Sequence, residues 1–323
     1  MNKKNIILAI KILVILLLIA AFSHVFYKAW TQYEQMETKP VIDWFKLAAA
    51  GFVYFLALIP PAYFWHRLML QFQQKPTVWE SIRAHICGQI GKYVPGKAMV
   101  VVIRTALVQS ERTNVPVAAA AAFLETLTLM AVGAFLACAF LSWYSFQTGD
   151  WILLAGSVVM VLCAGLPTVP AVFVWIVRKI GKSKIAAGLT DIEHLPAKSL
   201  VFGWGLEILC WCGFAVSYWL TLSAVGVNNL NFLSDFPRMI GVVSFAVSAG
   251  FLILVLPGGL GVRDLAFIGL MTPWMESHMP GGGMAMATIA SIVLRLTWLS
   301  VECAAAVMLY CIPAGKKEPG EDE

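Results

Sequence analysis

Charged residues are scarce in this sequence. Only 13% of its 323 residues are Asp, Glu, Lys or Arg, whereas 60% are hydrophobic. Soluble domains carry about 25% charged residues, so the scarcity excludes a soluble domain of any size. In a bilayer, backbone groups are satisfied only within helices or a closed barrel, and the apolar stretches here are continuous rather than alternating. The sequence therefore predicts an all-α, polytopic membrane helical bundle.

Signatures of nucleotide, metal and catalytic sites are also missing. There is no GxxxxGK[ST] loop, no HExxH or DxxD pattern, and no zinc-like spacing among the seven cysteines. The cysteines lie in apolar segments, where we expect them to be packing residues. The five histidines are scattered, and most are expected at the ends of spans. We predict no catalytic residue, no metal and no cofactor, and the modest charge of +5 does not favour nucleic acid as a partner.

Apolar stretches of roughly 20 residues or more, each long enough to cross a bilayer, number about seven. They cover approximately residues 6–26, 44–68, 115–142, 151–177, 199–225, 239–256 and 284–312. Proline pairs in the second stretch (Pro60 and Pro61) and the fourth (Pro167 and Pro170) predict kinks. We assign residues 1–314 to a single transmembrane domain and residues 315–323 to a short polar tail.

The distribution of lysine and arginine predicts the orientation. With a cytoplasmic N-terminus, ten of these residues fall in inside segments and three in outside segments, in accord with the positive-inside rule. The ten are Lys3, Lys4, Arg67, Lys75, Arg83, Arg178, Lys179, Lys182, Lys184 and Lys198, and the three are Lys28, Lys39 and Arg238. We expect a multi-pass protein of a bacterial-type cytoplasmic (inner) membrane, with its N-terminus in the cytoplasm.

Two stretches interrupt this pattern with a Pro-Gly break beside a short apolar run. Residues 85–109 contain Pro95 and Gly96, and residues 256–271 contain Pro257, Gly258, Gly259 and Gly261. Such breaks predict two re-entrant segments, which are tolerated only where protein or water surrounds them. Their similar positions in two halves, roughly 40–180 and 198–312, indicate a weak internal repeat and point to a transporter's binding site. The halves are parallel with the spans counted here, and one further crossing would make them inverted.

Eight ionisable residues lie within or beside the apolar segments. They are Lys97, Arg104, Glu125, Glu207, Arg263, Asp264, Arg295 and Glu302. Each such residue costs about 2.5–3.5 kcal/mol at the centre of a membrane helix and needs a partner. Three interpretations stay open: structural ion pairs, cavity-facing groups that bind an anionic headgroup, and snorkelling at helix ends.

Arginine beside a helix N-terminus suits phosphate, which favours an anionic headgroup as the ligand. The candidate headgroup-binding residues are Lys97, Arg104, Glu125, Arg263, Asp264 and Arg295. Because Arg263 and Asp264 are adjacent in the sequence, their side chains should point to different sides and should not pair with each other.

The same motifs resemble the transmembrane region of the lysylphosphatidylglycerol synthase/flippase family. The matching pieces are Tyr93-Val-Pro-Gly-Lys97 with Arg104, Glu125, Leu256-Pro-Gly-Gly-Leu-Gly-Val-Arg263, and Arg295. The resemblance covers about residues 40–312. Asp264 stands where this family usually has glutamate, and Thr126 follows Glu125 where the family commonly has arginine. The resemblance implies binding or translocation of an anionic lipid or a lipid-linked precursor, without the aminoacyl transfer of full-length synthases.

Three functions are compatible with the sequence. The leading hypothesis is a lipid transporter or flippase-like protein for an anionic phospholipid or a polyprenyl phosphate precursor. The alternatives are a membrane assembly or regulatory partner of a lipid- or glycan-modifying enzyme, and an intramembrane transferase. The expected partner is membrane lipid, alongside a membrane protein or a second copy of the chain.

Overall fold

The computed structural model describes residues 23–36, 39–94, 98–110, 112–149, 151–169, 171–173, 175, 196–227, 230–252 and 261–311. Within these ranges the chain is helical and has no strand, with one isolated bridge between Ser110 and Thr113. The predicted fold class, an all-α membrane helical bundle, is confirmed. Outside the described residues lie most of the first predicted span, Pro95 to Lys97, Pro257 to Gly259, and the predicted tail.

The described helices follow one another along the chain in a fixed order. A helix over 23–35 is followed by α2 (Trp44–Ala57), α3 (Ile59–Gln71), α4 (Val78–Gly88), the 3-10 helix η1 (Gln89–Tyr93), α5 (Ala98–Val108), α6 (Val115–Thr148), α7 (Trp151–Gly165), the 3-10 helix η2 (Leu166–Thr168), α10 (Ala197–Ala224), α11 (Phe232–Leu252), α12 (Val262–His278) and α13 (Gly283–Cys311).

Five of the described apolar stretches are long enough to cross a membrane. They are Trp44–Gln71, Val115–Trp143, Ala197–Ala224, Phe232–Leu252 and Gly283–Cys311. Each corresponds to one of the seven predicted spans. The span predicted at 151–177 is interrupted at the first of the two prolines that predicted a kink there, because α7 ends at Gly165 and η2 carries Pro167 in its first turn. Proline lacks the N–H that would continue the helix and disfavours helical backbone before it.

Two further boundaries differ from the predicted ones. α11 begins at Phe232 rather than near 239, since the Asn231 side chain accepts hydrogen bonds from the backbone N–H groups of Leu233 and Ser234. This cap lets the helix extend beyond its apolar run. The short apolar run after the second predicted break is part of the 17-residue helix α12. Gly261, which precedes this helix, has a backbone φ of +82°.

The predicted kink in the second span is confirmed. α2 ends at Ala57 and α3 begins at Ile59, so Leu58 separates the two helices. Pro60 and Pro61 occupy the first turn of α3, where a missing backbone N–H removes no helical hydrogen bond.

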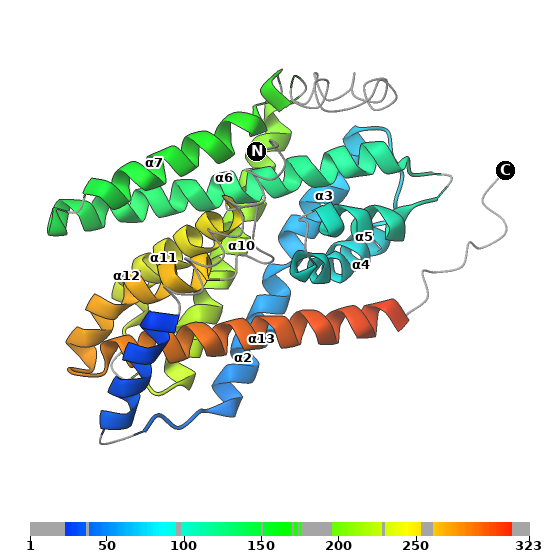
Figure 1. Ribbon diagram of the computed structural model, residues 1–323. Coiled ribbons are helices and arrows are strands. Elements are labelled where there is room, and N and C mark those ends of the chain that lie inside the picture. The colour runs from blue at the N-terminus through cyan, green and yellow to red at the C-terminus, as the bar shows by residue number, and fades with distance from the viewer. Residues whose placement is uncertain are drawn as a thin grey trace, which may run out of the picture.

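The long helices form a layered bundle (Figure 1). α6 and α7 lie side by side on one flank, α11 and α12 lie below them, and α13 closes the opposite flank. α2, α3 and α10 run between these flanks, with α10 packed along α2 and α3. The core is rich in aromatic side chains, and Trp211 donates from its indole nitrogen to the Leu129 carbonyl at 2.9 Å, which joins α10 to α6.

The short helices α4 and α5 pack against each other between α6 and α13 (Figure 1). Thr77 and Glu80 form a capping box at the start of α4, with hydrogen bonds of 3.1 and 2.7 Å. Eleven helical residues extend about 16 Å, which is about half of the 30 Å hydrocarbon core. Neither helix can cross a bilayer alone, and α4 buries Ala84, His85 and Ile86 in protein.

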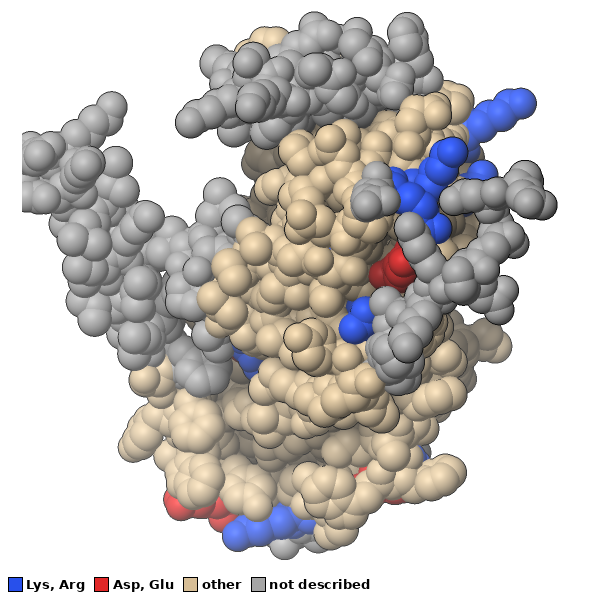
Figure 2. All heavy atoms as spheres, turned by 90° about the vertical axis from the view of Figure 1, so that its right-hand side faces the viewer, with Lys and Arg blue, Asp and Glu red and all other residues tan. Residues whose placement is uncertain are grey.

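The outer surface carries many large apolar side chains. Trp44, Phe45, Ile152 and Leu233 are each between 73% and 85% exposed. On the side shown in Figure 2, most described atoms belong to uncharged residues, and the basic side chains stand in separate groups. Extensive exposed apolar surface is typical of contact with lipid.

Gly133 allows α6 to approach α10 and α11 closely. A Cβ atom at this position would collide with the Trp211 ring and would lie 2.7 Å from the Ser248 hydroxyl. We expect Gly133→Ala to destabilise the bundle by about 1–3 kcal/mol, as overpacking does, and to lower the melting temperature measured in detergent. Gly156→Ala in α7 is the matched control, because its Cβ would meet no atom within 4 Å. Equal melting temperatures for the two variants would contradict this packing.

Candidate functional site

A cavity of about 380 Å³ lies at the centre of the bundle. Its wall is mainly apolar and includes Val100, Phe123, Met130, Phe214 and Val247. The polar and charged side chains that reach it come from α2, α4, η1, α5, α6 and α12. They are Tyr54, His85, Gln89, Lys92, Tyr93, Arg104, Glu125, Thr126 and Arg263.

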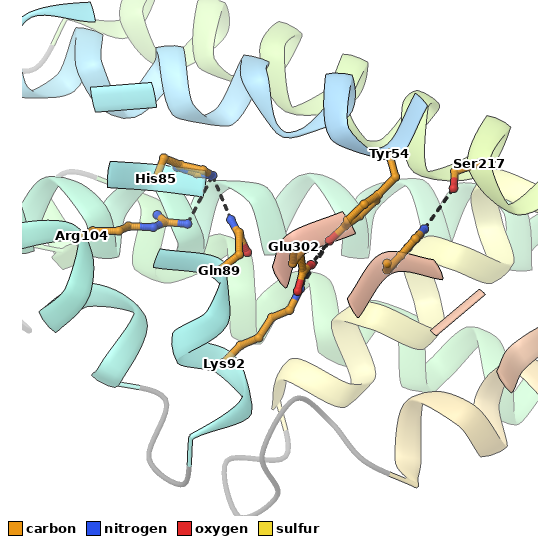
Figure 3. Close-up of polar contacts among 8 residues, drawn as sticks. Tyr54, His85, Gln89, Lys92, Arg104, Ser217 and Glu302 are labelled. Atoms are coloured by element: carbon orange, nitrogen blue, oxygen red, sulfur yellow. Dashed lines mark hydrogen bonds and ion pairs between the residues drawn. The ribbon is translucent and has the colours of Figure 1, made fainter. Parts of the chain in front are cut away.

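The first charged group in the wall is the ion pair of Arg104 and Glu125. Arg104 Nη1 donates to Glu125 Oε2 at 2.6 Å, and the two side chains are 4% and 0% exposed. The Thr126 hydroxyl donates to the same oxygen at 3.2 Å. Gly88 leaves room for the arginine, since a Cβ atom there would collide with its side chain. Arg104 Nη2 also lies 3.3 Å from His85 Nε2 (Figure 3).

The second group joins three elements through Glu302. This buried carboxylate of α13 accepts from Lys92 Nζ of η1 and from the Tyr54 hydroxyl of α2 (Figure 3). The Tyr54 ring stacks on Trp298 with centroids 4.4 Å apart and an interplanar angle of 9°. The contact holds η1 against α2 and α13.

The third group lies at the start of α12. Asp264 accepts from Arg295 and from the Gly261 backbone N–H, the latter at 3.2 Å. The Arg263 guanidinium instead faces the cavity, 5.3 Å from the centroid of the Trp298 ring. Adjacent side chains on a helix point about 100° apart, so Arg263 and Asp264 point to different sides, as predicted. Arg263 is 8% exposed, and no carboxylate in the described part of the chain forms an ion pair with it.

The six predicted headgroup-binding residues fall into three groups. Arg104, Glu125 and Arg263 line the cavity. Asp264 and Arg295 pair with each other beside it. Lys97 lies outside the described residues. Of the other predicted intramembrane charges, Glu302 pairs with Lys92, and both Glu207 oxygens are buried without a hydrogen-bond partner in the described structure.

Several residues of the wall were not expected from the sequence. Lys92 lies just before the first motif and was not selected, and His85 was expected at a span end but is 1% exposed inside the bundle. His66 is similarly buried, at 5%. A usable signal was present, because His85, Gln89 and Lys92 are spaced i, i+4 and i+7 and share one helical face. Three cysteines expected in the core, Cys163, Cys303 and Cys311, are exposed on the outer, apolar surface.

Comparison with known proteins identifies one family. A model of the family described as the lysylphosphatidylglycerol synthase transmembrane region matches residues 6–300. The match begins earlier and ends earlier than the 40–312 inferred from the motifs, and it includes Arg104, Glu125, Arg263 and Arg295. No curated protein sequence matches the chain significantly.

The pairing of Arg104 with Glu125 predicts a coupled effect of substitution. Arg104→Gln and Glu125→Gln should each destabilise the protein by about 3–5 kcal/mol, because each leaves one buried charge without its partner. The loss of stability in the double variant should be smaller than the sum of the losses in the two single variants. Melting temperatures of the four proteins in one detergent test this, and additive losses would show that the two residues act independently.

Proposed function

Since this chain belongs to the family of the lysylphosphatidylglycerol synthase transmembrane region, we propose that it binds an anionic lipid in the central cavity and moves it across the membrane. The lipid is a phospholipid or a polyprenyl phosphate-linked precursor. The observation that carries the proposal is the cavity itself, which combines an apolar wall with three basic side chains.

The charge around the cavity favours an anion. Lys92, Arg104 and Arg263 contribute three positive charges, whereas their bonded partners Glu125 and Glu302 contribute two negative charges. The difference, three minus two, is one positive charge, and it resides on Arg263. An unpaired charge is costly within a membrane, and a phosphate group would compensate it through the bidentate bonds that arginine forms.

The apolar part of the wall suits the hydrocarbon chains of the same lipid. Phe123 of α6 lines the cavity and is 50% exposed. Val100 and Val101 of α5 continue this apolar lining. A lipid could therefore place its headgroup beside Arg263 and Arg104 while its chains remain in contact with apolar side chains.

We propose transport rather than catalysis. The carboxylates Glu125 and Glu302 are bonded to Arg104 and Lys92, whereas an acid–base enzyme needs a free group directed at its substrate. Movement of the lipid would then be driven by a gradient or by a partner protein, because the sequence carries no nucleotide-binding loop.

Replacing Arg263 should weaken lipid binding without disturbing an ion pair. We expect Arg263→Gln to lose at least tenfold in affinity for phosphatidylglycerol, which corresponds to about 1.4 kcal/mol. Native mass spectrometry of the purified protein with added phosphatidylglycerol measures retention, and fluorescent phosphatidylglycerol in vesicles measures translocation.

Arg112→Gln is the matched control for that experiment. Arg112 is 47% exposed and lies 3.8 Å from Glu80, away from the cavity, so this variant should behave as wild type. Phosphatidylcholine serves as the neutral lipid. Equal retention of phosphatidylglycerol and phosphatidylcholine by wild type, or equal retention of phosphatidylglycerol by the Arg263→Gln and Arg112→Gln variants, would contradict the proposed headgroup site.

A further inference from the structure

A second pocket, of about 150 Å³, lies between α3 and α10 and has no lining residue in common with the central cavity. Each of the two helices supplies one side of its wall. The wall includes Phe64, Arg67 and Gln71 of α3 and Lys198, Ser199 and Phe202 of α10. The three α3 residues are spaced i, i+3 and i+7, so they share one face of that helix. The pocket is therefore a feature of the surface where α3 and α10 meet.

Close packing of the two helices forms this pocket. Gly203 of α10 lies against Phe64 of α3, and a Cβ atom at Gly203 would collide with the phenylalanine ring. Gln71 Nε2 of α3 donates a hydrogen bond to Ser199 Oγ of α10. Contacts between the helices themselves thus hold the wall residues in place, and the pocket exists before any ligand binds.

The pocket carries two basic side chains that have no acidic partner. The Arg67 guanidinium lies 6.0 Å from the centroid of the Phe202 ring. Among the residues that the structure describes, no carboxylate forms an ion pair with Arg67 or Lys198, and both side chains are exposed. Gln71 Oε1 is also left without a hydrogen-bond partner in that part of the chain. These groups are suited to an anionic ligand that brings further polar atoms.

The pocket lies at the ends of two candidate membrane spans. One span ends at Gln71 and another begins at Ala197, which places the basic side chains at the level of the membrane surface. Along α10, Val201 and Phe202 come next and are 72% and 47% exposed, as is typical of side chains that contact lipid. The positive-inside rule assigns Arg67 and Lys198 to the cytoplasmic side, where anionic lipids attract basic groups.

We propose that this pocket binds the phosphate group of an anionic phospholipid of the cytoplasmic leaflet, at a site separate from the central cavity. Arg67 and Lys198 contact the phosphate, and arginine can hold it through two parallel hydrogen bonds. The acyl chains lie along Val201 and Phe202. Basic pockets between membrane helices on the cytoplasmic side bind lipid headgroups in this way. Free phosphate would use the same two cations but would gain nothing from the apolar residues.

Native mass spectrometry with added phosphatidylglycerol tests the pocket. The Arg263→Gln protein is the background, so the comparison holds whether or not the central cavity binds lipid. Adding Arg67→Gln/Lys198→Gln should weaken phosphatidylglycerol binding by about tenfold, because the headgroup loses both of its cations.

Lys28→Gln/Lys39→Gln in the same background is the matched control. It also removes two positive charges, and both lysines are exposed on segments predicted to lie outside the cytoplasm. This variant should bind phosphatidylglycerol as the background protein does. Equal losses in the two variants would overturn the pocket, because they would show a general attraction between a basic protein and an anionic lipid.

Melting temperatures in detergent identify the ligand. A lipid that bridges α3 and α10 stabilises the folded protein, so phosphatidylglycerol should raise the melting temperature of the background protein more than phosphatidylcholine does. The difference should disappear in the Arg67→Gln/Lys198→Gln variant. An equal rise with inorganic phosphate alone would assign the pocket to free phosphate and overturn the lipid. Equal melting temperatures with the two lipids in the background protein would overturn the site, even where the substituted protein failed to fold.

Discussion

The need to compensate charge inside an apolar bundle organises this molecule. Each buried ion pair joins two helices: Arg104 and Glu125 join α5 to α6, Asp264 and Arg295 join α12 to α13, and Lys92 and Glu302 join η1 to α13, which is far away in the sequence. Lipid tails give helices no hydrophobic reason to associate, so packing and polar contacts have to hold them together. The three pairs thereby fix the positions of the short helices, which define the cavity.

Much of the fold could be predicted from the sequence, because the signals are strong and local. Long apolar runs located five helices that are able to span a membrane, and Pro60 with Pro61 located the break between α2 and α3. Pro167 likewise marked the end of α7 inside a hydrophobic run. Prediction failed at the start of α11, where the Asn231 cap begins a helix before its apolar run.

The candidate site was only partly accessible from the sequence. The cost of a buried charge selected Arg104, Glu125 and Arg263, which all line the cavity, since that argument depends only on the surrounding apolar sequence. It could not distinguish Arg263, which faces the cavity, from Arg295, which bonds to Asp264. Lys92 was not selected as a site residue because it lies in a short polar stretch of the sequence. Its place in the wall depends on Glu302, which is 210 residues away in the chain.

α4 and η1 are attached to the last helix at successive points. Arg83 donates to the carbonyls of Leu309 and Tyr310 at 2.8 and 3.3 Å, the Cys87 thiol lies 3.8 Å from the Ala306 carbonyl, and Lys92 bonds to Glu302. As the residue number rises along α4 and η1, it falls along α13, so the two run antiparallel over about two turns of α13. They should therefore move as one rigid body. A conformational change that admits a large ligand is then expected to separate this body from α5 and α6, rather than to bend α4 away from α13.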